Sequence, residues 1–428
     1  MKRSAWLGLP AGWAKSAFIT LSFMTVSLAA VGDTVWIESA PGSATGNGIS
    51  ADAYYQPYGG QVVLALNSAD ELNAAYSTYY NTTGRAGLHA RILRGGVWQA
   101  SAPGSDSSIG LAPSSWKVEF LHMATTGGGR PFVLWVKSNA GSGPSFYLTG
   151  LRYDGTWWAG IGGSDTATPF GSPSSTATPD DVTADADGNP VVFYMNNALY
   201  VKRYDGSAWA EMGVGSASGS GLFQKSWSPA MVCTKPKPGA QPVILWGSPI
   251  GYSTDEIYAM RWDGTAWQNM PGASSPFVTT STMSRTPSAC LAADNQPIFI
   301  GSGKGVMKFN GSAWQTLGTT NSLGFGFAGI ACAPDGTLLA AGVEPTSNSI
   351  IARRYNPGAN TWDLFGVTSA PSSEIGFSLP LYGQASPSCV GLAIDSAGTA
   401  CLAWVTPGNR VYVKKTSIAS RVEDWKRH

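Results

Sequence analysis

The residue types that usually carry out catalysis are few in this chain and widely separated. Its three histidines are His89, His122 and His428. None has a partner at the spacing of a metal site, so the sequence gives little support to metal or histidine-based nucleophilic catalysis. We interpret the histidines as strand residues. The sequence predicts no catalytic residue, no metal ion and no other cofactor, which favours a binding protein over an enzyme.

Acidic side chains do not form a clear catalytic pattern either. Asp185, Asp187 and Asn189 alternate as in a calcium-binding loop, but equivalent turns at Asp294 and Asp335 make a tight turn the better interpretation. Carboxylates from distant segments could still meet as a pair for glycoside hydrolysis. The sequence singles out no such pair.

The five cysteines predict buried core residues and at most one disulfide. Most lie in apolar stretches, and none is in a Cys-x-x-Cys motif. Cys389 and Cys401 are the one pair that neighbouring strands could bring together, although their register looks imperfect. The other three are Cys233, Cys290 and Cys332.

Composition points to strands and tight turns. The 428 residues include 53 glycines, 17 tryptophans and 16 tyrosines, with only 12% charged residues. Aromatic residues favour strands and glycine favours turns, so an all-β fold is expected. The net charge of +1 provides no field for a phosphate backbone, and we expect no nucleic-acid partner.

The N-terminal segment has the features of a secretory signal. Lys2, Arg3 and Lys15 precede an apolar run over 17–30, and small residues follow it. The run is shorter than the ~20 residues that span a bilayer, which argues against a membrane anchor. We predict a signal peptide over 1–32 and a mature chain, 33–428, that has no integral membrane segment and is secreted, extracellular or periplasmic.

A short motif recurs along the chain and marks a tight turn. Each copy has an aromatic residue, then Asp-Gly or Asn-Gly, and a tryptophan three residues after the glycine. Asp-Gly between two apolar runs is a strong hairpin signal because glycine supplies the positive φ of the turn. The clear copies span 152–158, 203–209, 261–267 and 308–314, and shorter versions precede Trp98 and Trp362.

A second turn precedes each copy, so every unit has four strands. Examples are the turns at 187–190 and 294–297, each followed by an apolar strand. Four antiparallel strands in a repeat of roughly 50 residues are typical of a propeller blade, with the last-strand tryptophan packed between blades. Seven tryptophans fit this position and predict a single seven-bladed β-propeller domain: Trp36, Trp98, Trp158, Trp209, Trp267, Trp314 and Trp362.

The ring needs a strand from one end of the chain to close it. Residues 35–43 echo residues 97–105, so the mature N-terminus resembles a fourth strand without a blade of its own. The last blade, from about 387 to 415, lacks a fourth strand. We predict that the N-terminal strand closes the ring. Residues 422–425 are the alternative closing strand.

The stretch from Tyr355 to Trp362 resembles the second half of a kelch repeat, and the shorter Asp-Gly copies look like trimmed versions of it. The segment Trp262-Asp263-Gly264 with Trp267 is more weakly similar to the repeats of propeller lectins. Both resemblances imply a propeller, although the regular double glycine of kelch repeats is missing. Four arginines occupy the same position in different copies of the repeat, which indicates a structural role. They are Arg152, Arg203, Arg261 and Arg354.

Blade connectivity predicts which face binds a ligand. The turns between strands 1 and 2 and between strands 3 and 4 share one face and are short, whereas the opposite face carries long crossings rich in Gly, Ser, Thr and Pro. We predict that this long-loop face recognises a glycan or protein ligand without catalysis. The alternative is a carbohydrate-active hydrolase or lyase with its site over the central channel. The candidate ligand-binding residues are Trp116, Trp227, Tyr252, Arg285 and Tyr382.

Overall fold

The computed structural model describes twenty segments of the chain. They are residues 34–50, 61–80, 85–107, 110–111, 116–139, 146–166, 170, 178–195, 198–224, 231–249, 255–270, 278–280, 288–301, 305–318, 323, 327–344, 349–366, 376–377, 390–406 and 410–418. All of them belong to one compact unit, Asp33–Ala419. The predicted signal peptide and residues 422–425 lie outside the described residues.

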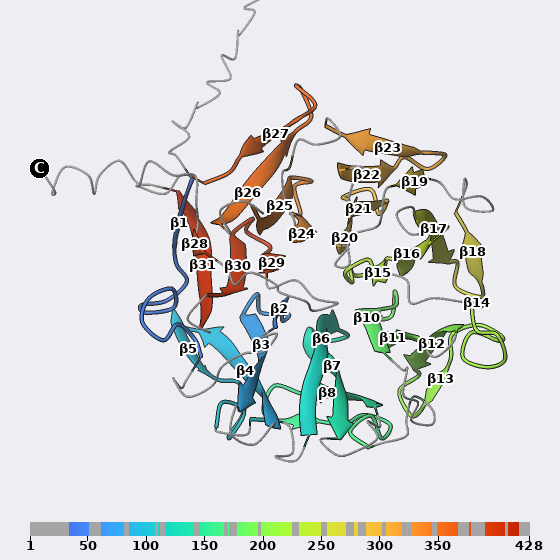
Figure 1. The fold of residues 1–428 in the computed structure, drawn as a ribbon, viewed down its shortest axis with the longest axis horizontal. Helices are drawn as coiled ribbons and strands as arrows, with labels where there is room; N and C mark the ends of the chain where they lie inside the picture. Colours follow the sequence, from blue (N-terminus) through green and yellow to red (C-terminus); the bar gives the residue numbers. More distant parts are fainter. Residues whose placement is uncertain are drawn as a thin grey trace, which may run out of the picture. The chain divides into compact units, whose positions relative to one another are not determined.

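Within these segments every element is a strand, and the strands form seven separate sheets around a ring (Figure 1). Each sheet contains four antiparallel strands in simple meander order, and three sheets have one extra short strand. The predicted all-β, seven-bladed propeller is therefore confirmed. The first strand of each blade lies nearest the centre of the ring in Figure 1.

Blades 1 to 3 follow the chain from residue 62. Blade 1 contains β2 (Val62–Leu66), β3 (Leu72–Tyr80), β4 (Arg85–Arg94) and β5 (Val97–Ala100). Blade 2 contains β6 (Trp116–Thr126), β7 (Arg130–Asn139), β8 (Phe146–Tyr153) and β9 (Trp158–Ala159). Blade 3 contains β10 (Thr178–Ala184), β11 (Pro190–Met195), β12 (Ala198–Tyr204) and β13 (Trp209–Glu211), with β14 (Phe223–Gln224) paired to β12.

Blades 4 to 6 repeat this arrangement. Blade 4 contains β15 (Met231–Cys233), β16 (Val243–Pro249), β17 (Asp255–Trp262), β18 (Trp267–Asn269) and the added β19 (Val278–Thr280). Blade 5 contains β20 (Ser288–Leu291), β21 (Pro297–Gly301), β22 (Gly305–Phe309) and β23 (Trp314–Leu317). Blade 6 contains β24 (Phe327–Cys332), β25 (Leu338–Val343), β26 (Ser349–Asn356), β27 (Thr361–Leu364) and the added β28 (Gly376–Phe377).

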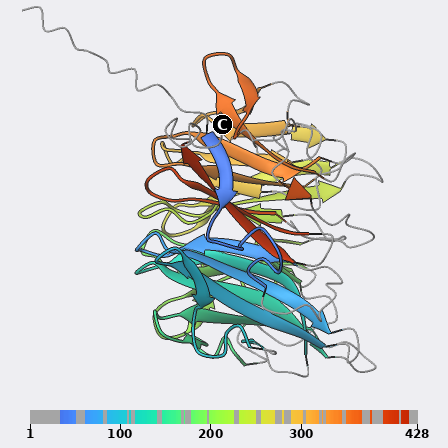
Figure 2. The same ribbon diagram turned by 90° about the vertical axis from the view of Figure 1, so that its left-hand side faces the viewer.

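Blade 7 combines the two ends of the described chain. It contains β29 (Val390–Ile394), β30 (Ala400–Val405) and β31 (Val411–Ile418), and its fourth strand is β1 (Thr34–Glu38). Trp36 lies opposite Thr416 in this antiparallel pair. Figure 2 shows β1, in blue, beside the red strands of the last blade. The predicted closure by the N-terminal strand is confirmed.

The second strand of each blade is buried over its middle part because neighbouring blades cover both of its faces. All six residues of β11, β25 and β30 are buried. Phe132 of blade 2, for example, shares a core cluster with Val182 and Val192 of blade 3. The core of the protein therefore consists of the layers between blades, not of one central cluster.

The Asp-Gly turns have the conformation that the motif predicts. The carboxylate of Asp205 accepts hydrogen bonds from the backbone N–H groups of Ser207 and Ala208, both at 2.8 Å, and Gly206 has φ of 103°. The Ala208 and Ser207 amides lower the pKa of Asp205 to about 2. Asp154, Asp263 and Asn310 accept the same pair of amide bonds. The Asp or Asn side chain thus fixes each turn from inside.

The recurring tryptophans connect neighbouring blades, as predicted. Indole Nε1 donates from Trp209 to the carbonyl of Ile161, from Trp267 to Met212 and from Trp362 to Leu317, at 2.7 to 2.8 Å. Each acceptor lies at the end of the fourth strand of the preceding blade or just after it. A tryptophan therefore joins one blade to the end of the one before it.

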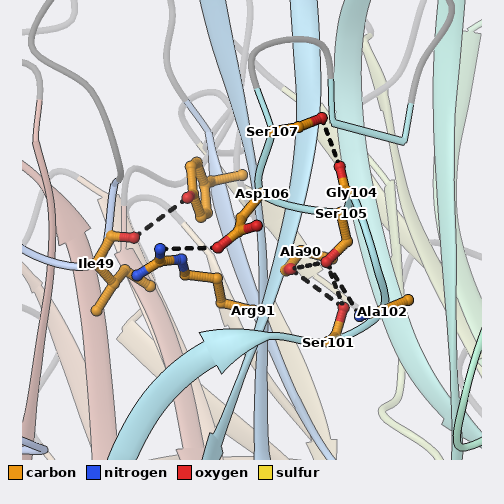
Figure 3. Close-up of polar contacts among 10 residues, drawn as sticks. Ile49, Ala90, Arg91, Ser101, Ala102, Gly104, Ser105, Asp106 and Ser107 are labelled. Atoms are coloured by element: carbon orange, nitrogen blue, oxygen red, sulfur yellow. Dashed lines mark hydrogen bonds and ion pairs between the residues drawn. The ribbon is translucent and has the colours of Figure 1, made fainter.

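A serine after the fourth strand completes this joint. Ser105 Oγ donates to the carbonyl of Ala90 at 2.7 Å and Ser101 Oγ donates to the same oxygen at 3.1 Å (Figure 3). Trp158 of the next blade donates to Ser101 Oγ at 2.7 Å. The N-terminal copy has the same contacts: Ser39 and Ser43 both donate to Val413, and Trp98 donates to Ser39. This geometry explains why residues 35–43 echo residues 97–105.

Candidate functional site

The short turns between first and second strands touch one another from blade to blade. Asp70 of blade 1 accepts a hydrogen bond from Ser396 of blade 7. The Gly127 amide of blade 2 donates to the Gly188 carbonyl of blade 3 at 2.6 Å. Lys237 of blade 4 donates to the carbonyls of Ala292 and Ala293 of blade 5. These contacts restrain the short-turn face.

One polar cluster joins the innermost strands of three consecutive blades. His122 comes from β6, Asp181 from β10, and Lys235 follows β15 by two residues. In Figure 1 these strands stand next to one another at the centre of the ring. We call these three residues the inner-strand cluster.

Irregular backbone in two strands positions His122 and Asp181 of this cluster. The pairing of β6 with β7 shifts register between Glu119 and His122, where Phe120 has a positive φ of 52°. The pairing of β10 with β11 shifts between Pro179 and Asp181. A β-bulge turns the following side chain away from the regular alternation and is common beside functional sites. Positive φ at a residue as bulky as phenylalanine is also unusual, and such strain tends to gather at functional positions.

Asp181 holds the cluster together through both of its carboxylate oxygens. Oδ2 accepts a hydrogen bond from the Cys233 amide at 3.0 Å, and Oδ1 accepts one at 2.8 Å from the amide of Val182, the next residue in the chain. Oδ1 also lies 3.3 Å from Lys235 Nζ and 3.4 Å from His122 Nδ1. Four donor groups therefore surround one buried carboxylate.

The charges of Asp181 and Lys235 stabilise each other. Burial alone would raise the pKa of Asp181, but Lys235, His122 and the Cys233 amide outweigh it and hold that pKa well below its usual range. Desolvation opposes the charge on Lys235, and Asp181 more than offsets this and raises the pKa of the ammonium. Burial, with Asp181 nearby, raises the pKa of the Cys233 thiol well above its ordinary value. Asp181 is thus anionic, Lys235 cationic and Cys233 a neutral thiol.

Solvent reaches the basic side chains of the cluster and not the carboxylate. The exposed fraction of the side chain is 46% for Lys235, 20% for His122 and 4% for Asp181. A ligand in this region would therefore meet an ammonium and an imidazole. The carboxylate behind them positions both groups.

His89 lies in β4 and His122 in β6, so both are strand residues as predicted. His89 is buried and stacks on Tyr76, with ring centroids 5.3 Å apart. His122 has carboxylate and lysine neighbours that no pattern in the sequence indicated. His428 lies outside the described residues.

The predicted ligand-binding residues are not brought together within the described residues. The backbone of Trp116 begins β6 and pairs with Asn139. The side chain of Trp116 is not described, and four further candidates lie outside the described residues altogether: Trp227, Tyr252, Arg285 and Tyr382. Their role in binding stays a prediction.

The repeated arginines contact protein groups in or beside their own blades. Arg203 lies 3.3 Å from Asp185. Arg261 donates to Gln296 of blade 5 at 3.1 Å, and Arg152 stands over the ring of Tyr204 in blade 3. These contacts fit the structural role that their shared repeat position indicated.

The turn at Asp185 is closed by its own backbone. The Asp185 carboxylate accepts from the amides of Asp187 and Asn189 at 3.0 and 2.8 Å, as in the tight turn that we expected. No group of three or more potential metal ligands occurs among the described residues. Within the same residues no helix is long and apolar enough to cross a membrane.

The described cysteines carry free thiols. They are Cys233, Cys290, Cys332 and Cys401. Cys389 lies outside the described residues, and Cys401, the other half of the disulfide considered above, is a buried free thiol.

Comparisons with known proteins leave the family open. No family model matches the sequence, and no curated protein matches it significantly. The likeness of 355–362 to kelch repeats therefore stays a resemblance.

Solved structures that resemble this chain do so distantly. One of unknown function from Dyadobacter fermentans is 12% identical, covering 71% of this chain and 95% of its own, with a TM-score of 0.41. A lectin of Aleuria aurantia bound to Fucα1-6GlcNAc is 14% identical (70% and 96% covered, TM-score 0.40). The polysaccharide lyase Uly1 is 11% identical (91% and 100% covered, TM-score 0.46). At these values no ligand or reaction transfers to this chain.

Proposed function

We propose that this protein is a non-enzymatic binding propeller that works outside the cytoplasm and holds a glycan or protein ligand on its long-loop face. The proposal for its location rests on the signal-like segment over 1–32. The proposal for binding rests on the difference between the two faces of the ring.

The observation that carries the proposal is the length of the chain between strands. Short turns join Ala184 to Pro190 and Tyr204 to Trp209, and similar turns recur on the same face of the other blades, except for the longer connection from Cys233 to Val243 in blade 4. The crossings on the opposite face are several times longer, for example from Ala159 to Thr178 and from Leu364 to Val390. Ligand sites favour a rigid scaffold that carries long, variable loops. Because contacts between blades constrain the short turns, the loops of the opposite face are the ones whose length and sequence can vary.

A glycan array on the mature protein tests this proposal. We expect retention on a limited set of glycans, and the retained glycans should be recovered unchanged after prolonged incubation. Release of shorter oligosaccharides or unsaturated products, detected by mass spectrometry, would instead support the carbohydrate-active hydrolase or lyase. Retention of no glycan would overturn the glycan form of the proposal and direct the search to protein ligands.

Two sets of alanine substitutions separate binding from folding. Trp116→Ala, Trp227→Ala and Tyr252→Ala are expected to weaken binding of an array-selected glycan by about tenfold, since stacking on an aromatic ring contributes on the order of 1 kcal/mol. Their melting temperatures should change little.

Trp209→Ala and Trp267→Ala should have the reverse effect. Each indole donates a hydrogen bond to the preceding blade, and Trp209 also packs edge-on to Phe170 with centroids 4.7 Å apart. We expect each to lose about 3 kcal/mol of unfolding free energy. If binding responds instead to changes at the turns 205–206 and 263–264, the short-turn face is the functional one.

A further inference from the structure

We propose that the inner-strand cluster is an oxyanion subsite: Lys235 and His122, fixed by Asp181, bind a carboxylate, sulfate or phosphate group of the ligand. This inference rests on the proposed binding function and adds the chemical class of the group that is recognised. It concerns residues of the inner strands and not the aromatic candidates on the long-loop face. Lys235 lies in the connection between β15 and β16, so a ligand held on the long-loop face would have to extend its acidic group along the inner strands to reach it.

The cluster differs from the other ion pairs of the described residues in its connections. Arg91 with Asp106, Arg94 with Glu71, Arg203 with Asp185 and Lys308 with Asp294 each pair one cation with one carboxylate inside a single blade. Asp181 instead meets two basic side chains from the blades on either side of its own. Asp181 therefore links three blades, which no other ion pair of the described residues does.

The carboxylate is fully occupied, whereas its basic partners retain unused donors. Both oxygens of Asp181 accept hydrogen bonds from backbone amides before the side chains are counted. Lys235 has three N–H donors, and within the described residues Asp181 is the one acceptor that its ammonium contacts. His122 faces Asp181 through Nδ1, which leaves the second ring nitrogen for another group.

The ammonium of Lys235 is both held in place and open to solvent. Its Nζ lies 3.3 Å from Asp181 Oδ1, and solvent still reaches 46% of the side-chain surface. A dissolved ligand can therefore contact the ammonium without displacing Asp181.

The geometry suits a single oxyanion group. Lys235 Nζ and His122 Nδ1 both lie within 3.4 Å of Asp181 Oδ1, so Asp181 holds the two side chains beside each other. In the proposed subsite the remaining N–H donors of Lys235 and the second ring nitrogen of His122 contact the oxygens of one carboxylate, sulfate or phosphate. Hydrogen bonds from charged donors to such groups are about twice as strong as neutral ones. The overall charge of +1 provides no broad attraction, so recognition would depend on this local contact.

Small sugar acids test the subsite directly. We would titrate the intact mature protein with D-glucuronate, D-glucose 6-sulfate and D-glucose 6-phosphate by isothermal titration calorimetry, with D-glucose as the neutral reference. At least one acid should bind at least about tenfold more tightly than glucose. Comparison of the three acids identifies whether a carboxylate, a sulfate or a phosphate is preferred.

Variants locate the binding to this cluster. Lys235→Met should weaken binding of the preferred acid by about tenfold or more, and Lys235→Arg should stay within about threefold of the unchanged protein. His122→Gln keeps a donor and should have a smaller effect. Arg203→Met is the matched control, since Arg203 is also a half-exposed cation paired with a buried carboxylate, Asp185, on blade 3. Circular dichroism and melting curves show whether each variant is folded.

Several results would overturn the inference. They are equal affinity for glucose and all three acids, equal loss of binding in Arg203→Met and Lys235→Met, and undiminished binding in Lys235→Met. A positive glycan array together with any of these would leave the proposed function in place and remove only the oxyanion subsite. Binding of the acids together with product release on the array would keep the subsite and remove the non-enzymatic function.

Discussion

A mature chain that begins at residue 40 is expected to lose at least about 4 kcal/mol of unfolding free energy, because it lacks the strand that closes the ring. Trp36 is 5% exposed, donates to the Phe365 carbonyl at 3.0 Å and packs edge-on against the Phe365 ring. Without it, the outer edge of β31 is also unpaired. Thermal and denaturant melts measure the loss.

Deletion of residues 422–428 is the control for this truncation. The last described strand, β31, ends at Ile418, so we expect the shorter C-terminus to change the melting temperature by little. Trp36→Ala separates the indole from the strand and should account for about 3 kcal/mol of the loss. A larger effect from the C-terminal deletion than from the N-terminal one would contradict the closure.

Asp181→Asn is expected to destabilise the protein by about 2 kcal/mol at pH 7. Removing one member of a buried ion pair leaves the other charge without compensation, and the solvent exposure of Lys235 moderates the cost. Asparagine has nearly the same shape, and its oxygen can still accept the Cys233 amide, but its NH2 group replaces the oxygen that accepts from the Val182 amide and from Lys235. The substitution therefore removes the charge and one acceptor. Denaturant unfolding at several pH values measures the effect.

The pH dependence of this substitution has a definite sign. The pKa of Asp181 is lower in the folded protein than in the unfolded chain, so its stabilisation is complete above about pH 4 and is lost as the pH falls below that value. The difference between the unchanged protein and Asp181→Asn should therefore narrow in acid. Asp294→Asn, in an ion pair whose carboxylate is 52% exposed, should cost less than about 1 kcal/mol. A difference that stays constant from pH 7 to pH 2.5 would contradict the role of the Asp181 charge.

The blade architecture could be predicted because it depends on local signals repeated seven times. An Asp-Gly turn fixes its hairpin through its own side chain, as Asp205 does, and the tryptophan that follows has one repeated partner in the preceding blade. Closure could be predicted for the same reason: Ser39 and Ser43 repeat the contacts of Ser101 and Ser105.

The inner-strand cluster could not be predicted because its members share no motif. His122, Asp181 and Lys235 come from three blades, and bulges in two strands move His122 and Asp181 out of regular alternation. A search for polar residues in the first strands of consecutive blades would have found His122 and Asp181, and extending it by two residues would have found Lys235. The arrangement of the aromatic candidates could not be predicted for a different reason: the long crossings contain no repeated sequence pattern that fixes the direction of their side chains.

The closing strand also affects the order in which the protein folds. Blades 1 to 6 are each built from one continuous segment, whereas blade 7 needs β1, which is synthesised first, and β31, which is synthesised last. Until residue 418 is available, β1 has no partner, and the slow step of folding should be this pairing across the sequence. At high protein concentration the β1 strand of one molecule can complete the last blade of another. We therefore expect concentrated refolding to yield strand-exchanged dimers, and dilution to favour the closed monomer.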